Sequence, residues 1–236
     1  MIDVAEERSP QLDHHPFINV SFSLSGKQLP ADHGYLVYSA ISKSTPSLHG
    51  IDWLAIELVS GFRSGRGLIA LPERDATLRL RIPACHYRDV LPLAGKRLDI
   101  GGHQIRLGLP VARPLEPAPS LYARVVTIKK FTEAELFIEA VRRKLDSFGV
   151  RGGVELPPDE RGRYRRRIVT IHGKSVVGFS VAVHELNDED SLLLQAGAVK
   201  VVGEDGSTQW QSIFSRRAMG CGIFNPVSAH PPEQDR

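Results

Sequence analysis

Sulfur-containing residues and long apolar runs are scarce in this chain of 236 residues, which has two cysteines and two methionines. No apolar run approaches the roughly 20 residues needed to cross a bilayer. Residues 1–15 lack the basic segment and apolar run of a secretion signal. Cys85 and Cys221 lie far apart, so we expect free thiols in a reducing cytoplasm. His86 follows Cys85, but one neighbour is not a ligand set, so neither a metal site nor a cofactor is expected.

Positive charge is modest in total but clustered. The formal net charge is +3 and the pI is about 8.9. Residues 161–167 read RGRYRRR, and further basic groups occupy 129–130, 142–144 and 216–217, all in the second half. Basic runs are usually solvated loops. Here the run precedes a strand hairpin, guanidinium groups bind phosphate in bidentate fashion, and Tyr164 could stack on a base, which favours a nucleic-acid partner.

Hydrophobic periodicity predicts the same order of elements in both halves. A strand begins at Phe17, and a helix at 33–44, capped by Asp32, is followed by strand-like runs with a short helix between them. In the second half, strand 121–130 precedes a helix with Thr132 as its cap. A hairpin around Gly173-Lys174, a short helix capped by Asn187 or Asp188, and the last strand follow.

This order predicts an α+β protein with two tandem ferredoxin-like domains, which are βαββαβ units of the RRM type. We expect a flexible leader at 1–14, domains at 15–111 and 121–226, and a disordered tail at 227–236. Three prolines in the stretch 112–120 indicate a linker. The fold alone specifies no function.

Two regions could carry chemistry. Tyr35, Tyr38 and Ser42 share one side of the predicted helix, and His33 and His49 lie at its start and shortly after its end. A histidine beside a tyrosine hydroxyl is a usable acid–base pair if the fold joins them, although His33 and Tyr35 could equally be structural. The stretch RRAMGCGIFNP, residues 216–226, could be a phosphate-binding glycine loop, a site of cysteine chemistry, or an ordinary turn before a strand.

Four motifs in order resemble the CRISPR-associated endoribonucleases that cut repeat RNA, a family within the RAMP superfamily. They are LPADHGYLVYSAIS with LH, LYARVVTIK, RRRIVTIHGKSVVGFSV and RRAMGCGIFNP. The likeness spans roughly residues 15–226 and is greatest to the short subtype first described from myxobacteria.

The resemblance implies cleavage of CRISPR repeat RNA without metal, leaving a 2′,3′-cyclic phosphate and a 5′-hydroxyl. It assigns the catalytic histidine to His49, with His33 as second choice, and an orienting tyrosine to Tyr38. The substrate is repeat RNA within precursor guide RNA. Other subunits of a CRISPR effector complex are further partners that the resemblance allows, and no membrane partner is expected. The residues expected to contact RNA are basic side chains and two glycines: Lys129, Arg163, Arg165, Arg166, Arg167, Lys174, Arg216, Arg217, Gly220 and Gly222.

Two departures from the family leave alternatives open. No lysine follows His49 within HGIDWLAIELV, and a long segment, GAVKVVGEDGSTQWQSIFS, precedes the last motif. The missing lysine suggests a cleavage-deficient subunit that only anchors repeat RNA. A two-domain protein with another ligand is the third alternative. The small Cys221, between two glycines and without a ligand pair, is expected to pack in the loop before the last strand.

Overall fold

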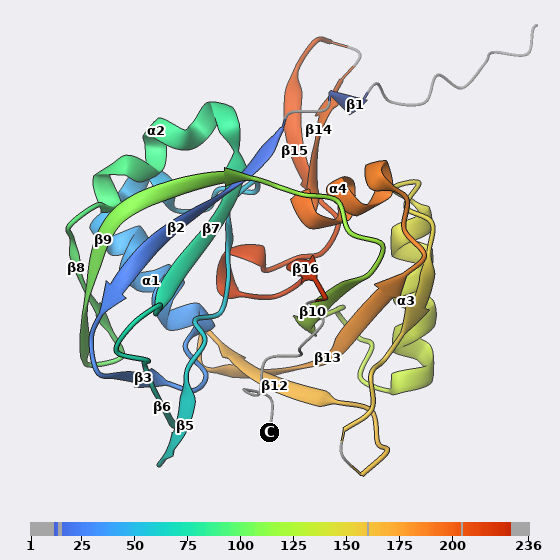
Figure 1. Cartoon of the computed structure of the whole chain (residues 1–236). Helices are drawn as coiled ribbons and strands as arrows, with labels where there is room; N and C mark the ends of the chain where they lie inside the picture. The colour runs from blue at the N-terminus through green and yellow to red at the C-terminus, as the bar shows by residue number, and fades with distance from the viewer. Residues whose placement is uncertain (1–11, 14–15, 160, 204, 228–236) are drawn as a thin grey trace, which may run out of the picture.

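A computed structural model describes residues 12–13, 16–159, 161–203 and 205–227 (Figure 1). Its first half contains a five-stranded antiparallel sheet in the order β4-β7-β2-β9-β8. The elements in chain order are β2 (Phe17–Ser25), α1 (Gly34–Ser44), the short helix η1 (Pro46–Leu48), β4 (Ala55–Ile56), β7 (Thr77–Pro83), the helical segment η2, α2 and η3 (Ala84–His86, Tyr87–Val90, Leu91–Leu93), β8 (Arg97–Ile100) and β9 (His103–Pro114). The last strand, β9, lies beside the first, β2. The third strand, β7, lies between β2 and the second strand, β4, which is the ferredoxin-like arrangement.

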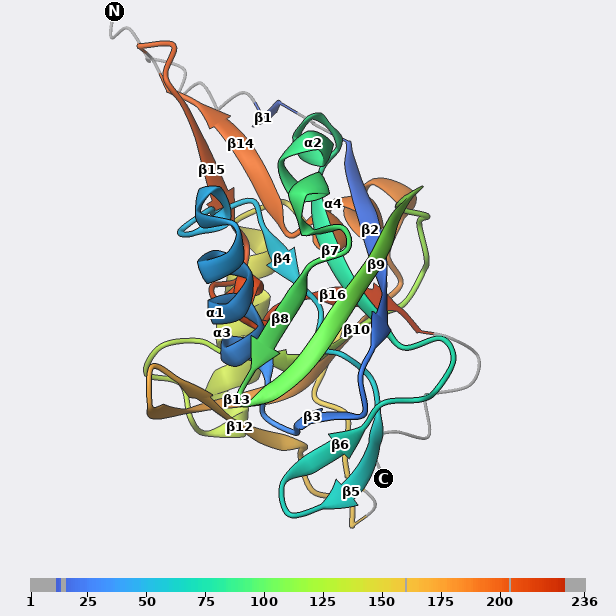
Figure 2. The same cartoon turned by 90° about the vertical axis from the view of Figure 1, so that its left-hand side faces the viewer.

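Alternation along β2 builds the core of this half. Val20 and Phe22 are fully buried, and they join Val37 and Ile41 of α1 in one cluster. Burying one such side chain contributes about 1.5–3 kcal/mol. The helix is therefore held on one side of the sheet by its apolar stripe. A smaller sheet of β3 (Gln28–Pro30), β6 (Leu68–Ala70) and β5 (Phe62–Gly65) projects from this half (Figure 2).

The second half repeats the arrangement with the strand order β11-β13-β10-β16. Its elements are β10 (Leu121–Val126), α3 (Ala134–Asp146), β11 (Gly153–Glu155), β12 (Arg166–Ile171), β13 (Lys174–His184), α4 (Asp188–Ala196) and β16 (Phe224–Pro226), with β12 paired to β13. Phe137 of α3 packs against Phe179 of β13, with ring centroids 4.8 Å apart. The expected pair of ferredoxin-like domains is confirmed.

An insertion between α4 and β16 departs from the simple fold. It contains β14 (Ala198–Val202), β15 (Thr208–Ser212) and the short helix η4 (Arg217–Met219). β1 (Leu12–Asp13) pairs with β14, so three strands form a separate sheet that extends away from the body of the molecule (Figure 1). The long segment before the last motif is therefore largely a hairpin, and its polar second strand was not predicted.

Local signals at element ends were partly misassigned. His33, not Asp32, precedes α1, and Glu133, not Thr132, precedes α3; neither makes a side-chain cap. Asn187 caps α4 as expected, because its Oδ1 accepts from the N–H of Asp190 at 2.8 Å. The expected linker begins inside β9, which runs to Pro114. The domain limits 15–111 and 121–226 stay predictions. Of the expected leader only Leu12–Asp13 is described, as part of β1, and the expected tail lies outside the described residues apart from Val227.

Candidate functional site

Tyr38, in the middle of α1, and His49, directly after η1, form a pair. Pro46 starts the short helix η1, which returns the chain so that His49 lies beside the helix. Tyr38 Oη lies 3.3 Å from His49 Nδ1 and accepts from the N–H of Gly50 at 3.1 Å. The two rings stack with centroids 5.8 Å apart. Tyr38 is buried and His49 is exposed, and no described residue hydrogen-bonds to His49 Nε2. The pair therefore presents one free imidazole nitrogen to solvent.

His33 has a different environment, because it is buried with 1% exposure. Its Nε2 accepts from the N–H of Val59 at 2.9 Å, so its Nδ1 carries the proton donated to the carbonyl of Pro30, also at 2.9 Å. Burial lowers the pKa of His33 below its ordinary value. Both nitrogens are thus engaged in holding the start of α1. Of the two candidate histidines, only His49 has the access that proton transfer to a substrate requires.

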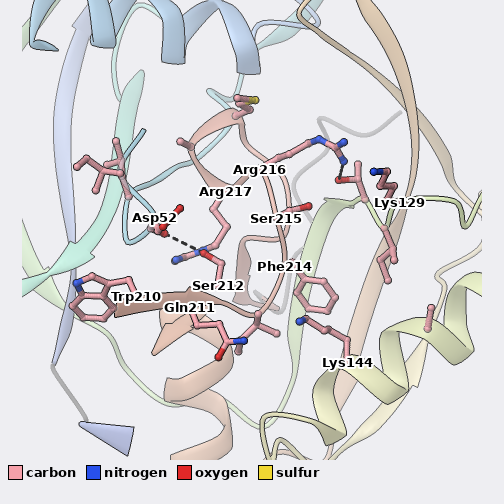
Figure 3. Close-up of a pocket in the computed structure, with 18 of the residues that line it drawn as sticks. Asp52, Lys129, Lys144, Trp210, Gln211, Ser212, Phe214, Ser215, Arg216 and Arg217 are labelled. Carbon is pink, nitrogen blue, oxygen red and sulfur yellow. Dashed lines mark hydrogen bonds between the residues drawn. The ribbon is translucent and has the colours of Figure 1, made fainter. Parts of the chain in front are cut away.

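A pocket of about 740 Å³ opens beside this pair, between the two halves of the chain (Figure 3). Tyr38 and Gly50 line it from the first half, and segment 210–219 lines it from the insertion. The remaining lining residues include three basic side chains of the second half: Lys129, Arg143 and Lys144. Asp52 is the acidic residue of the lining. Such an excess of cations beside a titratable pair suits an anionic substrate.

Arg143 and Lys144 belong to a basic group that the sequence shows, but neither was predicted as a site residue. Both lie in the last turn of α3. Only the fold brings this turn to the pocket beside Tyr38, because α3 belongs to the second half and α1 to the first. The signal available in sequence was the cluster of charge alone.

Arg216 and Arg217 are neighbours with opposite environments. Arg216 lines the pocket with φ of +65°, and its Nη1 donates to Thr127 Oγ1 at 3.0 Å. Figure 3 shows it extending toward Lys129, while Arg217 extends to the opposite side. Arg217 is 3% exposed, its Nη2 donates to the carbonyl of Ala196, and its Cζ lies 5.9 Å from the ring centre of Phe17. Arg217 is therefore largely a core residue, and its burial argues against the expected contact with RNA.

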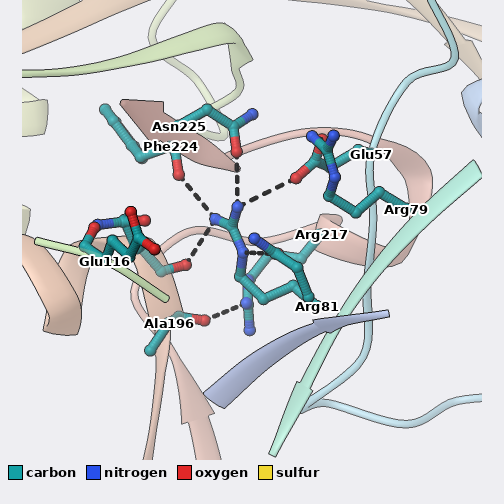
Figure 4. A network of polar contacts seen from close by, with 10 residues as sticks. Glu57, Arg79, Arg81, Glu116, Ala196, Arg217, Phe224 and Asn225 are labelled. Atoms are coloured by element: carbon teal, nitrogen blue, oxygen red, sulfur yellow. Dashed lines mark hydrogen bonds and ion pairs between the residues drawn. The ribbon is translucent and has the colours of Figure 1, made fainter. Parts of the chain in front are cut away.

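Arg217 lies beside a second buried arginine, Arg81 of β7 (Figure 4). Burial, together with the positive charge of Arg81, lowers the pKa of Arg217 to about 9. All five N–H groups of Arg81 donate to oxygens of both halves, at distances of 2.6–3.0 Å: Asn19 Oδ1, Glu57 Oε1, Asn225 Oδ1 and the carbonyls of Gln195 and Phe224. This network joins β7 to α4 and β16 in the interior, and sequence patterning gave no sign of it.

The glycine loop does not present its backbone to a ligand. Gly220 and Gly222 are buried, with φ of +82° and +64°. The N–H of Gly220 donates to the carbonyl of Arg217 at 3.1 Å, and that of Gly222 to Val125 at 2.8 Å. A Cβ on Gly220 would lie 2.4 Å from Leu58 Cδ2. Close packing therefore explains these glycines, which argues against their expected role in RNA contact.

The arginine run enters β12 on alternating sides. Arg166 and Arg167 pair with Phe179 and Gly178 of β13, so their side chains lie on opposite faces of the hairpin. Arg167 Nε donates to Ser180 Oγ at 3.4 Å. Ahead of the strand, Arg163 donates to Asp159 at 3.1 Å and Arg165 to the carbonyl of Pro158 at 3.0 Å. Only part of the run can thus face one ligand surface. Lys174 begins β13 and is exposed.

The cysteines also have distinct environments. Cys221 is fully buried, as its expected packing role requires, and burial raises the pKa of its thiol to about 11. Cys85 is exposed, and the two sulfurs are not bonded to each other. In the described part of the chain, no three His, Cys, Asp or Glu side chains gather as a potential metal site. Nor does any described helix have the length and hydrophobicity needed to span a bilayer.

Comparison with known proteins gives consistent matches. A family model described as "Cas6 Crispr" matches residues 18–229. The CRISPR-associated endonuclease Cas6 of Myxococcus xanthus strain DK1622 is 36% identical over 210 residues, covering 89% of this chain and 81% of that protein. Two solved structures, a CRISPR-associated Cas6 protein and a Cas6-related protein from Pyrococcus furiosus, are 12% and 10% identical, with TM-scores of 0.54 and 0.58. Each match covers 91% of this chain and 100% of the other. At such identities the structures support the fold alone.

Proposed function

The chain belongs to the Cas6 family of CRISPR-associated endonucleases, and from that premise we propose that it cuts CRISPR repeat RNA at the Tyr38–His49 pair. The observation that carries the proposal is the hydrogen-bonding distance between Tyr38 Oη and His49 Nδ1, with Gly50 fixing the hydroxyl from behind. The free Nε2 of an exposed imidazole can then exchange protons with a bound substrate. Both protonation states of an imidazole are accessible near neutral pH.

The proposed reaction is internal transesterification. The 2′-oxygen of the nucleotide before the cut attacks phosphorus and loses its proton to water, while the bond from phosphorus to the 5′-oxygen breaks. His49 Nε2–H protonates that leaving oxygen, and its Nδ1–H donates to Tyr38 Oη. The products are a 2′,3′-cyclic phosphate and a 5′-hydroxyl, and no step draws on a metal. Acid–base catalysis of this kind contributes about 10²–10⁴-fold, so in-line positioning of the RNA supplies much of the remainder.

Basic groups of the other half take the place of the lysine that is absent after His49. Lys129 and Arg216 line the pocket that Tyr38 also lines, and Arg216 is oriented by its bond to Thr127. We assign to them the charge of the phosphate near the cut and of the adjoining backbone. Arg166, Lys174, Arg143 and Lys144 supply further contacts with the RNA.

Incubation of the purified protein with its cognate repeat RNA in EDTA tests this proposal. We expect a cyclic-phosphate product from the wild type and a loss of about 10²–10⁴-fold in single-turnover rate for His49→Ala, with little change in affinity. His184→Ala is a matched control, because His184 ends β13 in the second half, where its ring contacts Ser120 and Glu155 and not Tyr38. A 2′-deoxy nucleotide before the cut should block the reaction. Full activity of His49→Ala would refute the assignment.

The same experiment decides the alternative of a cleavage-deficient scaffold, which the missing lysine favours. Tight binding of repeat RNA by the wild type without any cyclic-phosphate product would establish that alternative. For Lys129→Ala and Arg216→Ala we expect weaker binding and a smaller dependence of affinity on salt, since each phosphate contact contributes to that slope. Unchanged salt dependence would place the RNA elsewhere.

A further inference from the structure

A second tyrosine–histidine pair lies one helical turn from the first. Tyr35 Oη is 2.9 Å from Nδ1 of His172, which belongs to the tip of the β12–β13 hairpin, and the ring centroids are 4.5 Å apart. The rings of Tyr35 and Tyr38 are 6.5 Å apart, so four rings follow one another from His172 through both tyrosines to His49. Both histidines are exposed. Two residues three positions apart on α1 thus hold one histidine each by its Nδ1.

The backbone at His172 is an uncommon place for this side chain. Ile171 pairs with Lys174, which leaves His172 and Gly173 as a two-residue turn with φ of +49° and +72°. Positive φ at both positions defines a type I′ turn, in which Asn, Asp or Gly is preferred at the first position. Histidine is therefore not the residue that the turn itself favours. What it adds is the ring that contacts Tyr35.

A second contact fixes the hairpin tip against α1. The N–H of Thr170 donates to Asp32 Oδ2 at 2.6 Å, just before the start of the helix. The tip is thereby held from two sides, and the position of the His172 ring relative to the Tyr38–His49 pair is set in advance. A ring ordered in this way loses little freedom when a ligand stacks on it.

We propose that His172, backed by Tyr35, is a binding subsite for one unpaired nucleotide of the RNA, close to but not at the cut. The inference rests on the proposed function. The base of this nucleotide stacks on the face of the His172 imidazole that Tyr35 leaves open, since aromatic side chains accept any unpaired base in this way. Asp32 next to the tip disfavours a phosphate there, so the phosphate of this nucleotide lies toward Lys174 on the outer side. Two rings separate His172 from His49, which gives His172 a positioning role and leaves proton transfer to His49.

The test uses uncleavable repeat RNA, with a 2′-deoxy nucleotide before the cut, and a series in which each nucleotide near the cut is abasic in turn. One abasic position should weaken binding to the wild type about ten-fold, the size of one base–aromatic stack. His172→Asn should weaken binding of the intact RNA by a similar factor. The affinity of this variant should then fall no further when that nucleotide is abasic. Tyr35→Phe, which keeps the ring, should show a smaller loss. Glu185→Asn is the control, because Glu185 is another exposed residue with positive φ, at the far end of β13.

His172→Asn places a favoured residue in the turn, so its melting temperature should match that of the wild type. Equal losses for every abasic RNA would overturn the subsite. The subsite would also be overturned if His172→Asn left the dissociation constant unchanged but lowered the single-turnover rate on cleavable repeat RNA at saturation. That pattern belongs to a residue of the chemical step. A wild type that binds no repeat RNA would instead refute the proposed function. If the wild type binds repeat RNA but no abasic position shares its loss of affinity with His172→Asn, only the subsite is refuted.

Discussion

Replacing Arg81 by methionine tests whether one buried guanidinium holds the two halves of the chain together. The side chain is fully buried, and three of its five N–H groups donate across the junction, to Gln195, Phe224 and Asn225 (Figure 4). Methionine has a similar length and removes every donor. The carbonyls of Gln195 and Phe224 would then remain in the interior without this partner.

The expected cost follows from those orphaned groups. A buried polar group that loses its partner costs about 1–3 kcal/mol. Breaking a buried ion pair by removing one member costs about 3–5 kcal/mol. Glu57 is spared the full penalty because Arg79 Nη1 remains 2.8 Å from its Oε2. We therefore expect Arg81→Met to lower the free energy of unfolding by about 4 kcal/mol, a large share of the roughly 5–15 kcal/mol typical of a protein.

Urea denaturation followed by fluorescence and far-ultraviolet circular dichroism measures this loss, and Arg79→Met is the matched control. Arg79 has the same acidic partner, but its side chain is 41% exposed, so its pair should contribute at most about 1 kcal/mol. A loss for Arg81→Met no larger than that for Arg79→Met would refute the reasoning. It would mean that water or relaxation of the junction satisfies the orphaned carbonyls.

Three further outcomes follow from other buried groups. Because the pKa of His33 is lowered in the folded state, the unfolded chain binds a proton at pH values where the native state does not. The free energy of unfolding should therefore fall as the pH drops below about 6.5. His33→Gln should reduce this pH dependence in urea titrations at about pH 7.5 and 5.5. Gly220→Ala should destabilise by about 2 kcal/mol more than Gly206→Ala in thermal melts, since both have positive φ but only Gly220 lacks room for a Cβ. Equal losses would count against that packing. A thiol reagent at pH 8 should modify Cys85 promptly and reach Cys221, whose pKa is about 11, only after denaturation; two fast thiols would contradict this burial.

The fold was predictable where one periodicity dominated a segment. Strand 17–25 and helix 34–44 follow from regular spacing of apolar residues, and the order of such segments indicated both ferredoxin-like units. β15, with the sequence TQWQS, was missed because its residues have no apolar alternation. It is a strand through its pairing with β14, and pairing partners are not visible in a single segment.

The candidate site was predictable only in part. The resemblance, not the spacing, singled out Tyr38 and His49, and the structure brings them within hydrogen-bonding distance. Sequence could not separate Arg216 from Arg217, because two identical neighbours differ only through the left-handed backbone of Arg216 and the packing that follows. The place of Lys144 depends on how two domains meet. That information is spread over the whole chain.

Residues 216–222, the first part of the last motif, serve mainly to pack the two domains together and less to bind phosphate. Arg217 fills the interior beside Arg81, and Gly220 lets the loop approach Leu58. On the other side the motif meets α1, where a Cβ on Gly34 would lie 2.3 Å from the carbonyl oxygen of Met219. Arg216 is thus carried on a segment whose position is set by the helix that bears Tyr38. Substitutions in the buried part of the motif should therefore affect cleavage through the placement of Arg216 relative to His49, even where they touch no RNA.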